Sequence, residues 1–446
     1  MARAAREQWS TRLGFVLAAV GSAVGLGNMW RFSYLTAENG GAAFVLLYVA
    51  MTLVVGLPVL LAELVIGRGA RRSPIEALAH YGGPRWRTLG FVFVAAGFLI
   101  LAYYSVIAGW TVRYALVGLL IGFDGDAGER FGQLATGPRA LFWHLLFMAL
   151  TAGLVMGGVR RGIERASLVL MPLLFAIVLG LAVYAALLPG AEAGYRYYFQ
   201  PSFRDLLEVR VLRDAAGQAF FSLSLGMGAM LTYASYLSRD THLPRESLAI
   251  AGADFAVAFV AGLVVFPLLF AFGLQGEVGE STVGALFITL PHAFAEMGGA
   301  GRVVGVLFFV ALVVGALTSA VSLFEVVVSS LMDAADFERH HAALLLGAIV
   351  ALLGVPAASD LDVLGAMDTL AGNVLLLVGG LGLAVFVGWR MDDPVAEAAA
   401  GASGIRWFGL WRGLLRFAVP AVLLLVLWRT REETLRAVAA LAGAGS

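Results

Sequence analysis

The sequence predicts an all-α protein that crosses a membrane eleven times and whose first and sixth helices are broken at mid-membrane. Of its 446 residues, 60% are hydrophobic and only 13% are charged, whereas soluble domains are about 45–50% apolar and about 25% charged. Apolar segments of spanning length recur along the chain, and clustered glycines interrupt two of them. We therefore expect a single transmembrane domain over residues 1–446.

Eleven segments are long and apolar enough to cross a bilayer as helices, which need about 20 residues each. Residues 275–301 follow the seventh segment and are interrupted by Pro291 and several glycines, so we expect an outer re-entrant lid of short helices. Residues 391–405 are predicted to be a polar cytoplasmic linker. The eleven segments are residues 13–37, 42–67, 88–122, 140–158, 166–189, 212–237, 247–273, 302–331, 342–357, 363–389 and 407–428.

Arginine clusters predict how the chain lies in the membrane. They precede the first segment and follow the second, fourth and tenth, which places them all on one side. Because arginine is enriched in cytoplasmic loops, we expect a multi-pass protein of the inner (plasma) membrane, with the N-terminus in the cytoplasm and the C-terminus outside. The clusters are Arg3, Arg6 and Arg12; Arg68, Arg71, Arg72, Arg85 and Arg87; Arg160, Arg161 and Arg165; and Arg390, Arg406, Arg412 and Arg416.

Composition argues against several classes of function. Thirty basic residues balance thirty acidic ones, so no nucleic-acid partner is expected. Without cysteine there is neither a disulfide nor a thiolate metal site. His340 and His341 are adjacent rather than spaced as in a helical zinc site. We expect no enzymatic activity and no organic cofactor, and the oligomeric state stays open.

The first segment carries Gly21, Gly25, Gly27 and Asn28 in its middle, and Arg31 follows directly. Glycine is the poorest helix former after proline. A spanning helix can break at membrane depth only where the freed backbone groups find partners in protein or in a wet cavity. The exposed N–H groups of one half suit an anion, and the C=O groups of the other suit a cation. The break therefore predicts an ion-coupled binding site.

A second break falls in the sixth segment, at Ser222, Ser224, Gly226 and Gly228. Paired interruptions at corresponding places in two halves indicate an inverted-repeat transporter with a site near the membrane midplane. The repeats would be residues 12–190 and 211–390, with an extra helix at 407–428. The alternative is that these glycines serve only close helix packing.

Four stretches resemble a known family: GSAVGLGNMWRF (21–32), ENGGAAF (38–44), QAFFSLSLGMGA (218–229) and GALTSAVSLFE (315–325). The chain resembles the neurotransmitter:sodium symporter family, in its bacterial amino-acid-transporting branch, from Arg6 to the last predicted helix. The resemblance implies the leucine-transporter fold, with helices 1–5 and 6–10 as the two repeats. It also implies sodium-coupled symport of amino acids by alternating access.

By this resemblance the substrate carboxylate lies against the backbone N–H groups around Leu26 and Gly27 and the hydroxyl of Tyr104. Considered alone, Tyr104 is better explained as a packed or interfacial membrane aromatic. The whole substrate-binding set that the resemblance implies is Ser22, Ala23, Leu26, Gly27, Ile100, Tyr104, Phe221, Ser222, Ser224, Met227, Ser319 and Leu323.

This set contains no charged side chain, so an acidic or basic substrate would be left unpaired. Gly25 stands where relatives that carry monoamines have an aspartate, which favours an α-amino acid. Met227 is adaptable in shape. We expect neutral, and in particular hydrophobic or aromatic, L-amino acids.

The resemblance also implies two sodium sites made of oxygen ligands, which a hard cation prefers. The first would use the carbonyl of Ala23 with Asn28, Ser222 and Asp254, and the substrate carboxylate would complete it. The second would use carbonyls of Gly21, Val24 and Gly315 with the hydroxyls of Thr318 and Ser319. Such hydroxyls often bond only within their own helix, which is the alternative for Thr318.

Asp254 lies inside the seventh segment, where a charge is costly and marks function by default. Eukaryotic relatives need chloride in this neighbourhood, whereas bacterial relatives carry an acid. We therefore predict chloride-independent transport, with Asp254 as the negative charge. A structural buried ion pair is the alternative, and a single sequence leaves open whether Asp254 matches the ligand position or the acid one turn on.

The resemblance implies gates on both sides of the site. Arg31 and Asp368 would form the outer pair, with Phe221 and Tyr104 as a lid beneath them. Arg6 and Asp333 would form the inner pair, and Glu325 would join that network with a partner we cannot name. Trp9, Ser235 and Tyr236 would hold the N-terminal arm across the inner mouth.

In the fifth segment, Gly162 and Pro172 weaken the helix. We hypothesise that its cytoplasmic end unwinds to release sodium, and that Gly162→Ala slows this step.

Two other functions stay open: a proton-coupled carrier of the same fold, and a membrane sensor that binds amino acids without transporting them. A basic residue in place of Thr318 or Ser319 would indicate protons, and neither is replaced.

Overall fold

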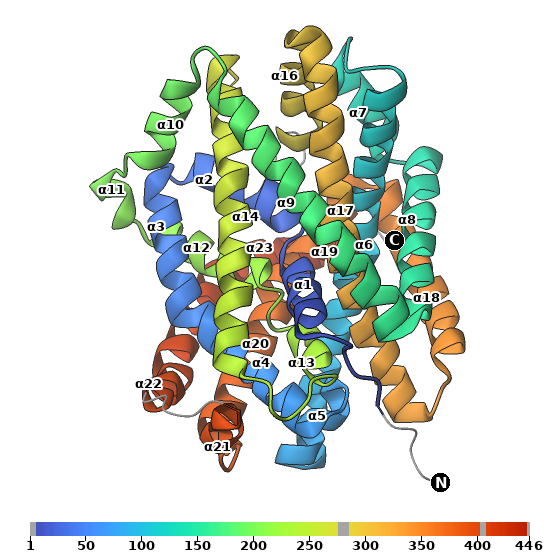
Figure 1. Ribbon diagram of the computed structural model, residues 1–446, viewed down its shortest axis with the longest axis vertical. Coiled ribbons are helices and arrows are strands. Elements are labelled where there is room, and N and C mark those ends of the chain that lie inside the picture. Colours follow the sequence, from blue (N-terminus) through green and yellow to red (C-terminus); the bar gives the residue numbers. More distant parts are fainter. Residues whose placement is uncertain (1–5, 275–284, 402–406, 444–446) are drawn as a thin grey trace.

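The computed structural model describes residues 6–274, 285–401 and 407–443, and every regular element in these ranges is a helix. The all-α class is therefore confirmed. Helices α7, α10 and α16 lie at one end of the molecule, which we call the outer end (Figure 1). Helices α5, α21 and α22 lie with the N-terminus at the other, which we call the inner end (Figure 1).

The first half of the chain forms spans one to five and the short helices between them. Its elements are α1 (Arg12–Ala23), η1 (Gly27–Arg31), α2 (Phe32–Glu38), α3 (Ala42–Met51), η2 (Thr52–Gly56), α4 (Leu57–Ala70), α5 (Pro74–Gly82), η3 (Pro84–Trp86), α6 (Arg87–Leu120), α7 (Ala127–Ala135), α8 (Pro138–Met156), η4 (Val159–Glu164) and α9 (Arg165–Ala186).

The second half forms the remaining spans and their connections. Its elements are α10 (Ala191–Phe199), α11 (Phe203–Leu206), α12 (Val209–Ser222), α13 (Ala229–Ala234), α14 (Leu243–Ala271), η5 (Ala285–Thr289), α16 (Leu290–Glu296), α17 (Gly298–Ala335), α18 (Arg339–Ser359), α19 (Leu361–Leu370), η6 (Ala371–Leu375), α20 (Leu376–Val385), η7 (Phe386–Arg390), α21 (Pro394–Ala399), α22 (Phe408–Gly413), η8 (Leu414–Ala418) and α23 (Val419–Gly443).

Ten of the eleven predicted spans meet a length and hydropathy criterion within the described residues. Nine are continuous, and the tenth is the bent pair Arg12–Ala23 and Gly27–Glu38. The sixth predicted span corresponds to α12 and α13, with 14 and 6 residues. Neither piece is long enough alone, so the count of eleven is not reached by this criterion.

The two interrupted spans lie against the long helices of the bundle. Helix α1 packs against α9, α14 and α17, and α12 and α13 pack against α3 and α4. The long helices α6 and α17 pack along each other and form the main scaffold. The predicted lid lies partly outside the described residues, because residues 275–284 are not among them. Its remainder forms η5 and α16, and the predicted 391–405 linker contains α21.

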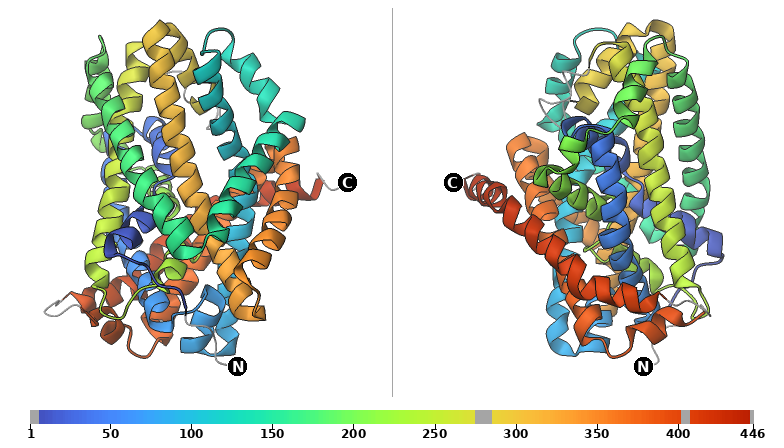
Figure 2. Two further views of the ribbon diagram at one scale, coloured as in Figure 1. Left: turned by 45° about the vertical axis from the view of Figure 1, so that its right-hand side comes forward. Right: turned by 90° about the vertical axis from the view of Figure 1, so that its left-hand side faces the viewer.

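The last helix is longer than the sequence predicts. The prediction ends at residue 428, but α23 continues to Gly443 and runs obliquely along the outside of the bundle (Figure 2). Residues 429–436 are mostly polar and interrupt the apolar stretch, yet arginine, glutamate, leucine and alanine are all good helix formers. The helix therefore continues past the residues that hydropathy assigns to the membrane span.

Backbone geometry at the second break depends on Gly226, which has φ +77°. A Cβ there would overlap the carbonyl oxygen of Leu376 on α20.

We predict that Gly226→Ala destabilises the protein by about 2 kcal/mol or more, because an alanine there would have a strained left-handed backbone and would clash with that oxygen. Gly217→Ala in α12 is the matched control, because nothing lies within 4 Å of its added Cβ. Thermal unfolding in detergent measures both, and equal midpoints would contradict the prediction.

Candidate functional site

The break in the first span presents backbone donors, as predicted. Helix α1 ends at Ala23, and Val24 is extended, with φ −77° and ψ 98°. The Gly25 N–H then donates to Asn28 Oδ1 at 3.2 Å, and the Leu26 N–H donates to Tyr104 Oη at 3.3 Å. Leu26 and Tyr104, both expected to bind a carboxylate, therefore lie within hydrogen-bond distance of each other.

Two glycines at this break have no room for a side chain. A Cβ on Gly25 would lie 2.5 Å from Ser319 Oγ and 2.9 Å from Tyr104 Oη. A Cβ on Gly27 would lie 2.9 Å from ring carbons of Phe221. A side chain at position 25 or 27 would therefore displace Ser319, Tyr104 or Phe221, which all belong to the predicted substrate site.

Three of the four residues predicted for the first sodium site, Asn28, Ser222 and Asp254, form one connected cluster. The Asn28 Nδ2 group donates to Asp254 Oδ1 at 2.6 Å and to Ser222 Oγ at 3.1 Å. The Ser222 hydroxyl donates to both Asp254 carboxylate oxygens, at 3.0 and 2.8 Å. Tyr48 Oη on α3 lies 3.1 Å from Ser222 Oγ and 3.2 Å from Asp254 Oδ2. A carboxylate, an amide and two hydroxyls gathered in this way suit a hard cation.

Asp254 is fully buried and surrounded by neutral groups. Its relative exposure is 0%, and no ion pair involves it among the described residues. Buried carboxylates are normally paired with a base or a metal ion, because an uncompensated buried charge is very costly. The structural ion pair considered as an alternative for Asp254 is therefore not formed here.

The residues predicted for the second sodium site also converge. The Ser319 hydroxyl on α17 lies 3.2 Å from Gly21 O, 3.1 Å from Ser22 O and 3.5 Å from Val24 O. A Cβ on Gly315 would lie 3.4 Å from Val24 O. The Thr318 hydroxyl instead donates to the carbonyls of Val314 and Gly315, within its own helix.

The expected side-chain subsite is buried. Ile100, Met227 and Leu323 are 2–4% exposed. Ser224 Oγ donates to Ser22 O at 2.8 Å, and Ser22 Oγ bonds to Ser322 Oγ at 2.7 Å.

The second break is held open by a carboxylate from another helix. Ser224 has φ +53°, a left-handed conformation that is strained for a residue with a side chain. Glu63 on α4 accepts from the Gly226 N–H at 2.9 Å and the Leu231 N–H at 3.2 Å. These are donors that the interrupted helix leaves without an intrahelical partner. Glu63 therefore connects α4 to the second break and to α13.

The outer gate residues share one pocket but do not form the predicted direct pair. The Arg31 guanidinium lies over the Phe221 ring, 4.6 Å from its centroid. Asp368 accepts from Tyr103 Oη at 2.8 Å, and no Arg31–Asp368 ion pair within 4.0 Å occurs in the described part of the chain. Both residues line a cavity of about 200 Å³. Arg31 thus covers Phe221, which in turn covers Gly27.

The inner gate residues are in direct contact. Arg6 donates to both oxygens of Asp333, at 3.0 and 2.8 Å, and to Ser235 Oγ at 2.8 and 3.1 Å. Its guanidinium lies 4.8 Å from the Tyr236 ring centroid. Trp9 Nε1 donates to Tyr233 O at 2.9 Å. The N-terminal segment is therefore fixed across the inner end.

Glu325 has the partners that the sequence left unnamed. It accepts from Tyr236 Oη at 2.5 Å and from Arg339 Nη1 at 2.6 Å. Arg339 also lies 3.7 Å from Glu7, so this pair connects the N-terminal segment to α17 and α18.

The start of the fifth span is irregular and is tied to the same N-terminal segment. Residues Val159–Glu164 form a π-helical turn, and Glu164 accepts from the N–H groups of Ser10 and Thr11 at 2.8 and 3.0 Å. A Cβ on Gly162 would overlap Leu154 O. Gly162→Ala would therefore displace this turn, so it does not test sodium release alone.

Sequence reasoning missed two residues that connect the breaks to each other and to α3. Tyr48 joins the first cluster from α3, and Gln218 Nε2 donates to Gly27 O at 3.0 Å. Each of these two residues has a polar group in an otherwise apolar span, and this could have marked it as a candidate. The sequence does not show, however, which residue of a neighbouring helix that polar group contacts.

These features define a class: a helical membrane transporter whose two interrupted spans hold oxygen ligands and backbone donors at one depth. The comparisons agree, since the model of the sodium:neurotransmitter symporter family matches residues 6–121 and 135–435. The chain belongs to this family and is a sodium-coupled membrane transporter, not an enzyme.

Individual relatives cover nearly the whole chain. The sodium-dependent transporter YhdH of Bacillus subtilis (strain 168) is 36% identical, covering 94% of this chain and 96% of its own length. A sodium-dependent transporter of Haemophilus influenzae is 32% identical, covering 94% and 97%. The crystal structure of MhsT in complex with L-phenylalanine is similar, with a TM-score of 0.87, 41% identity, and 95% and 99% coverage.

We predict that Tyr48→Phe weakens sodium binding about tenfold. The change removes a hydroxyl that lies against the Asp254 carboxylate, and a hydrogen bond to a charged group is worth about 1.5–3 kcal/mol. Tyr114→Phe is the matched control, because its buried hydroxyl donates to Phe287 O instead. The sodium dependence of thermal stabilisation measures the affinity, and the same half-maximal concentration in both variants would refute a role for Tyr48.

We also predict that Arg6→Gln loosens the N-terminal segment. Losing the contact with Asp333 should speed amide exchange at Ser10 and Thr11, which donate to Glu164, and at Val159, which donates to Glu7. Hydrogen–deuterium exchange reads these amides. The control is Arg245→Gln, an exposed arginine at the inner end, and unchanged exchange in Arg6→Gln would mean that this contact does not hold the segment.

Proposed function

We propose that this transporter carries neutral, hydrophobic or aromatic L-amino acids into the cell together with sodium, by alternating access and without chloride. The observation that carries the proposal is Asp254, a buried carboxylate without a basic partner among the described residues, surrounded by oxygen groups. A cation in this cluster would supply the missing charge. Two sodium ions are proposed, one at this cluster and one at the group around Ser319.

The proposal for the substrate rests on the first break and on one relative. The Leu26 N–H and the Tyr104 hydroxyl would bind the substrate carboxylate, which would then also face the cation held by Asn28 and Asp254. Each ligand would lower the desolvation penalty of the other, which couples their binding. The L-phenylalanine bound to MhsT supports an aromatic or hydrophobic side chain.

The remaining residues of the site would orient and enclose the substrate. Phe221 would close over it, with Arg31 stacked on the outer face of the ring. The Arg6–Asp333 pair would keep the inner side shut until sodium and substrate are bound. Sodium must favour the outward-open form, since a ligand without preference shifts no equilibrium. The membrane potential adds about 2.3 kcal/mol per charge per 100 mV to inward sodium movement.

The membrane arrangement is part of the same proposal. We propose that residues 12–190 and 211–390 are inverted repeats that rock against each other, and that residues 407–428 cross once more. The N-terminus would face the cytoplasm and the C-terminus the outside, in the inner membrane.

Uptake by protein reconstituted into liposomes tests this function. Labelled phenylalanine should accumulate under an inward sodium gradient, to the same extent when gluconate replaces chloride. Asn28→Ala should abolish accumulation, because the amide joins the first break to Ser222 and Asp254. Asn39→Ala is the control, since this amide is also buried but donates to Leu35 O of its own helix at 2.9 Å.

Each alternative has its own outcome. Accumulation driven by a pH gradient without sodium would indicate a proton-coupled carrier. Sodium-dependent binding with no accumulation would indicate a sensor. A requirement for chloride would contradict the role given to Asp254.

A further inference from the structure

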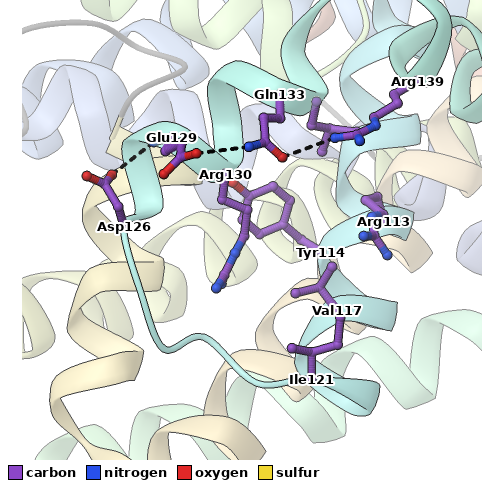
Figure 3. A pocket seen from close by; sticks show the side chains of 10 residues that line it. Arg113, Tyr114, Val117, Ile121, Asp126, Glu129, Arg130, Gln133 and Arg139 are labelled. Carbon is purple, nitrogen blue, oxygen red and sulfur yellow. Dashed lines mark hydrogen bonds between the residues drawn. The ribbon is translucent and has the colours of Figure 1, made fainter.

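Three arginines from three different helices surround one pocket at the outer end, apart from the transport site. Arg113 lies on α6, Arg130 on α7 and Arg139 near the start of α8 (Figure 3). The pocket has a volume of about 330 Å³. Arginine enrichment in cytoplasmic loops does not account for three arginines at this end.

The arginines of this pocket form no ion pair in the part of the chain that the structure describes. Arg113 also has no hydrogen bond within the described residues. Arg130 donates to the carbonyls of Gly122 and Asp124. Arg139 donates to Gln133 Oε1 at 3.1 Å.

The two acids of the pocket are engaged within α7 (Figure 3). Asp126 accepts from the Glu129 N–H at 2.9 Å, and Glu129 accepts from Gln133 Nε2 at 3.1 Å. The lining therefore offers three guanidinium groups, while its two carboxylates already accept hydrogen bonds from α7.

The pocket lies on the far side of α6 from the transport site. Arg113 follows Tyr104 by nine residues, which is about two and a half helical turns, so the two side chains leave opposite faces. Those nine residues rise about 13 Å along the axis. Half the hydrocarbon core is about 15 Å thick. With Tyr104 near the midplane, Arg113 reaches the level of the outer phospholipid head groups.

The surroundings of the pocket are those of a lipid-facing surface. At the end of α6, Leu120 and the following Ile121 are 70% and 67% exposed, and Leu120 follows Arg113 by two turns on the same face. On α8, Phe142 is 58% exposed. The two helices are in close contact at Gly109, where a Cβ would lie 2.6 Å from the backbone of Trp143. Above that contact the space between them forms the arginine pocket.

We propose that this pocket binds the phosphate of an anionic phospholipid in the outer leaflet. Arginine suits this role, because its planar guanidinium binds phosphate oxygens in a bidentate manner. A phosphodiester offers anionic oxygen acceptors to guanidinium groups that have no ion pair within the described residues. Its acyl chains would lie along the exposed apolar faces of α6 and α8. The simpler explanation, that each arginine only extends into water, predicts no saturable lipid site.

A titration of the purified protein with short-chain phosphatidylglycerol tests the proposal. The lipid should raise the thermal unfolding midpoint saturably in the unmodified protein. In the double variant Arg113→Gln with Arg139→Gln, the apparent affinity should fall about tenfold or more, since two charge-assisted contacts are lost. Arg204→Gln is the matched control, an exposed outer arginine outside the pocket, and should bind like the unmodified protein.

Further arms identify the source of the phosphate. Equal stabilisation by phosphatidylcholine would overturn the requirement for an anionic lipid. Stabilisation by inorganic phosphate but not by the lipid would assign the pocket to a soluble anion and overturn the proposal. Unchanged lipid affinity in the double variant would also overturn the proposal. If the double variant does not fold, native mass spectrometry of Arg113→Gln alone counts the lipid molecules that stay bound. Retention equal to that of the unmodified protein would also overturn the proposal.

Discussion

The Asp254 carboxylate is the point on which the centre of the molecule depends. It connects the seventh span to Asn28 in the first break, to Ser222 at the end of α12 and to Tyr48 on α3. Neutral donors reduce the penalty of burying this charge, but they do not remove it. The remaining penalty is what a cation beside this carboxylate would offset, and this is why the proposed sodium site is centred on Asp254.

Sequence reasoning located the breaks because glycine and serine in an apolar span have a direct physical meaning. The breaks at Val24 and around Gly226 both occur where the sequence predicts them. The sets around Asp254 and Ser319 came from the family resemblance, and the structure brings each together. Tyr48 and Gln218 were not found, because apolar periodicity does not tell which side chain of one span meets another span.

Other differences have local physical causes. Arg31 stacks on Phe221 instead of pairing with Asp368, whose carboxylate already accepts from Tyr103. Helix α23 extends beyond the apolar stretch, because helix propensity and membrane burial are separate preferences. Hydropathy therefore describes what the bilayer covers and not where a helix ends.

The capping of α13 by Glu63 has a mechanical consequence. It anchors the inner half of the sixth span to α4, and Trp9 adds a second anchor from the N-terminal segment. The outer half is instead attached to the first span, through Gln218 and through the ring of Phe221. The six residues between the halves, 223–228, thus join two pieces that are fixed to different parts of the bundle. A change that weakens the contacts of one piece would therefore leave those of the other in place.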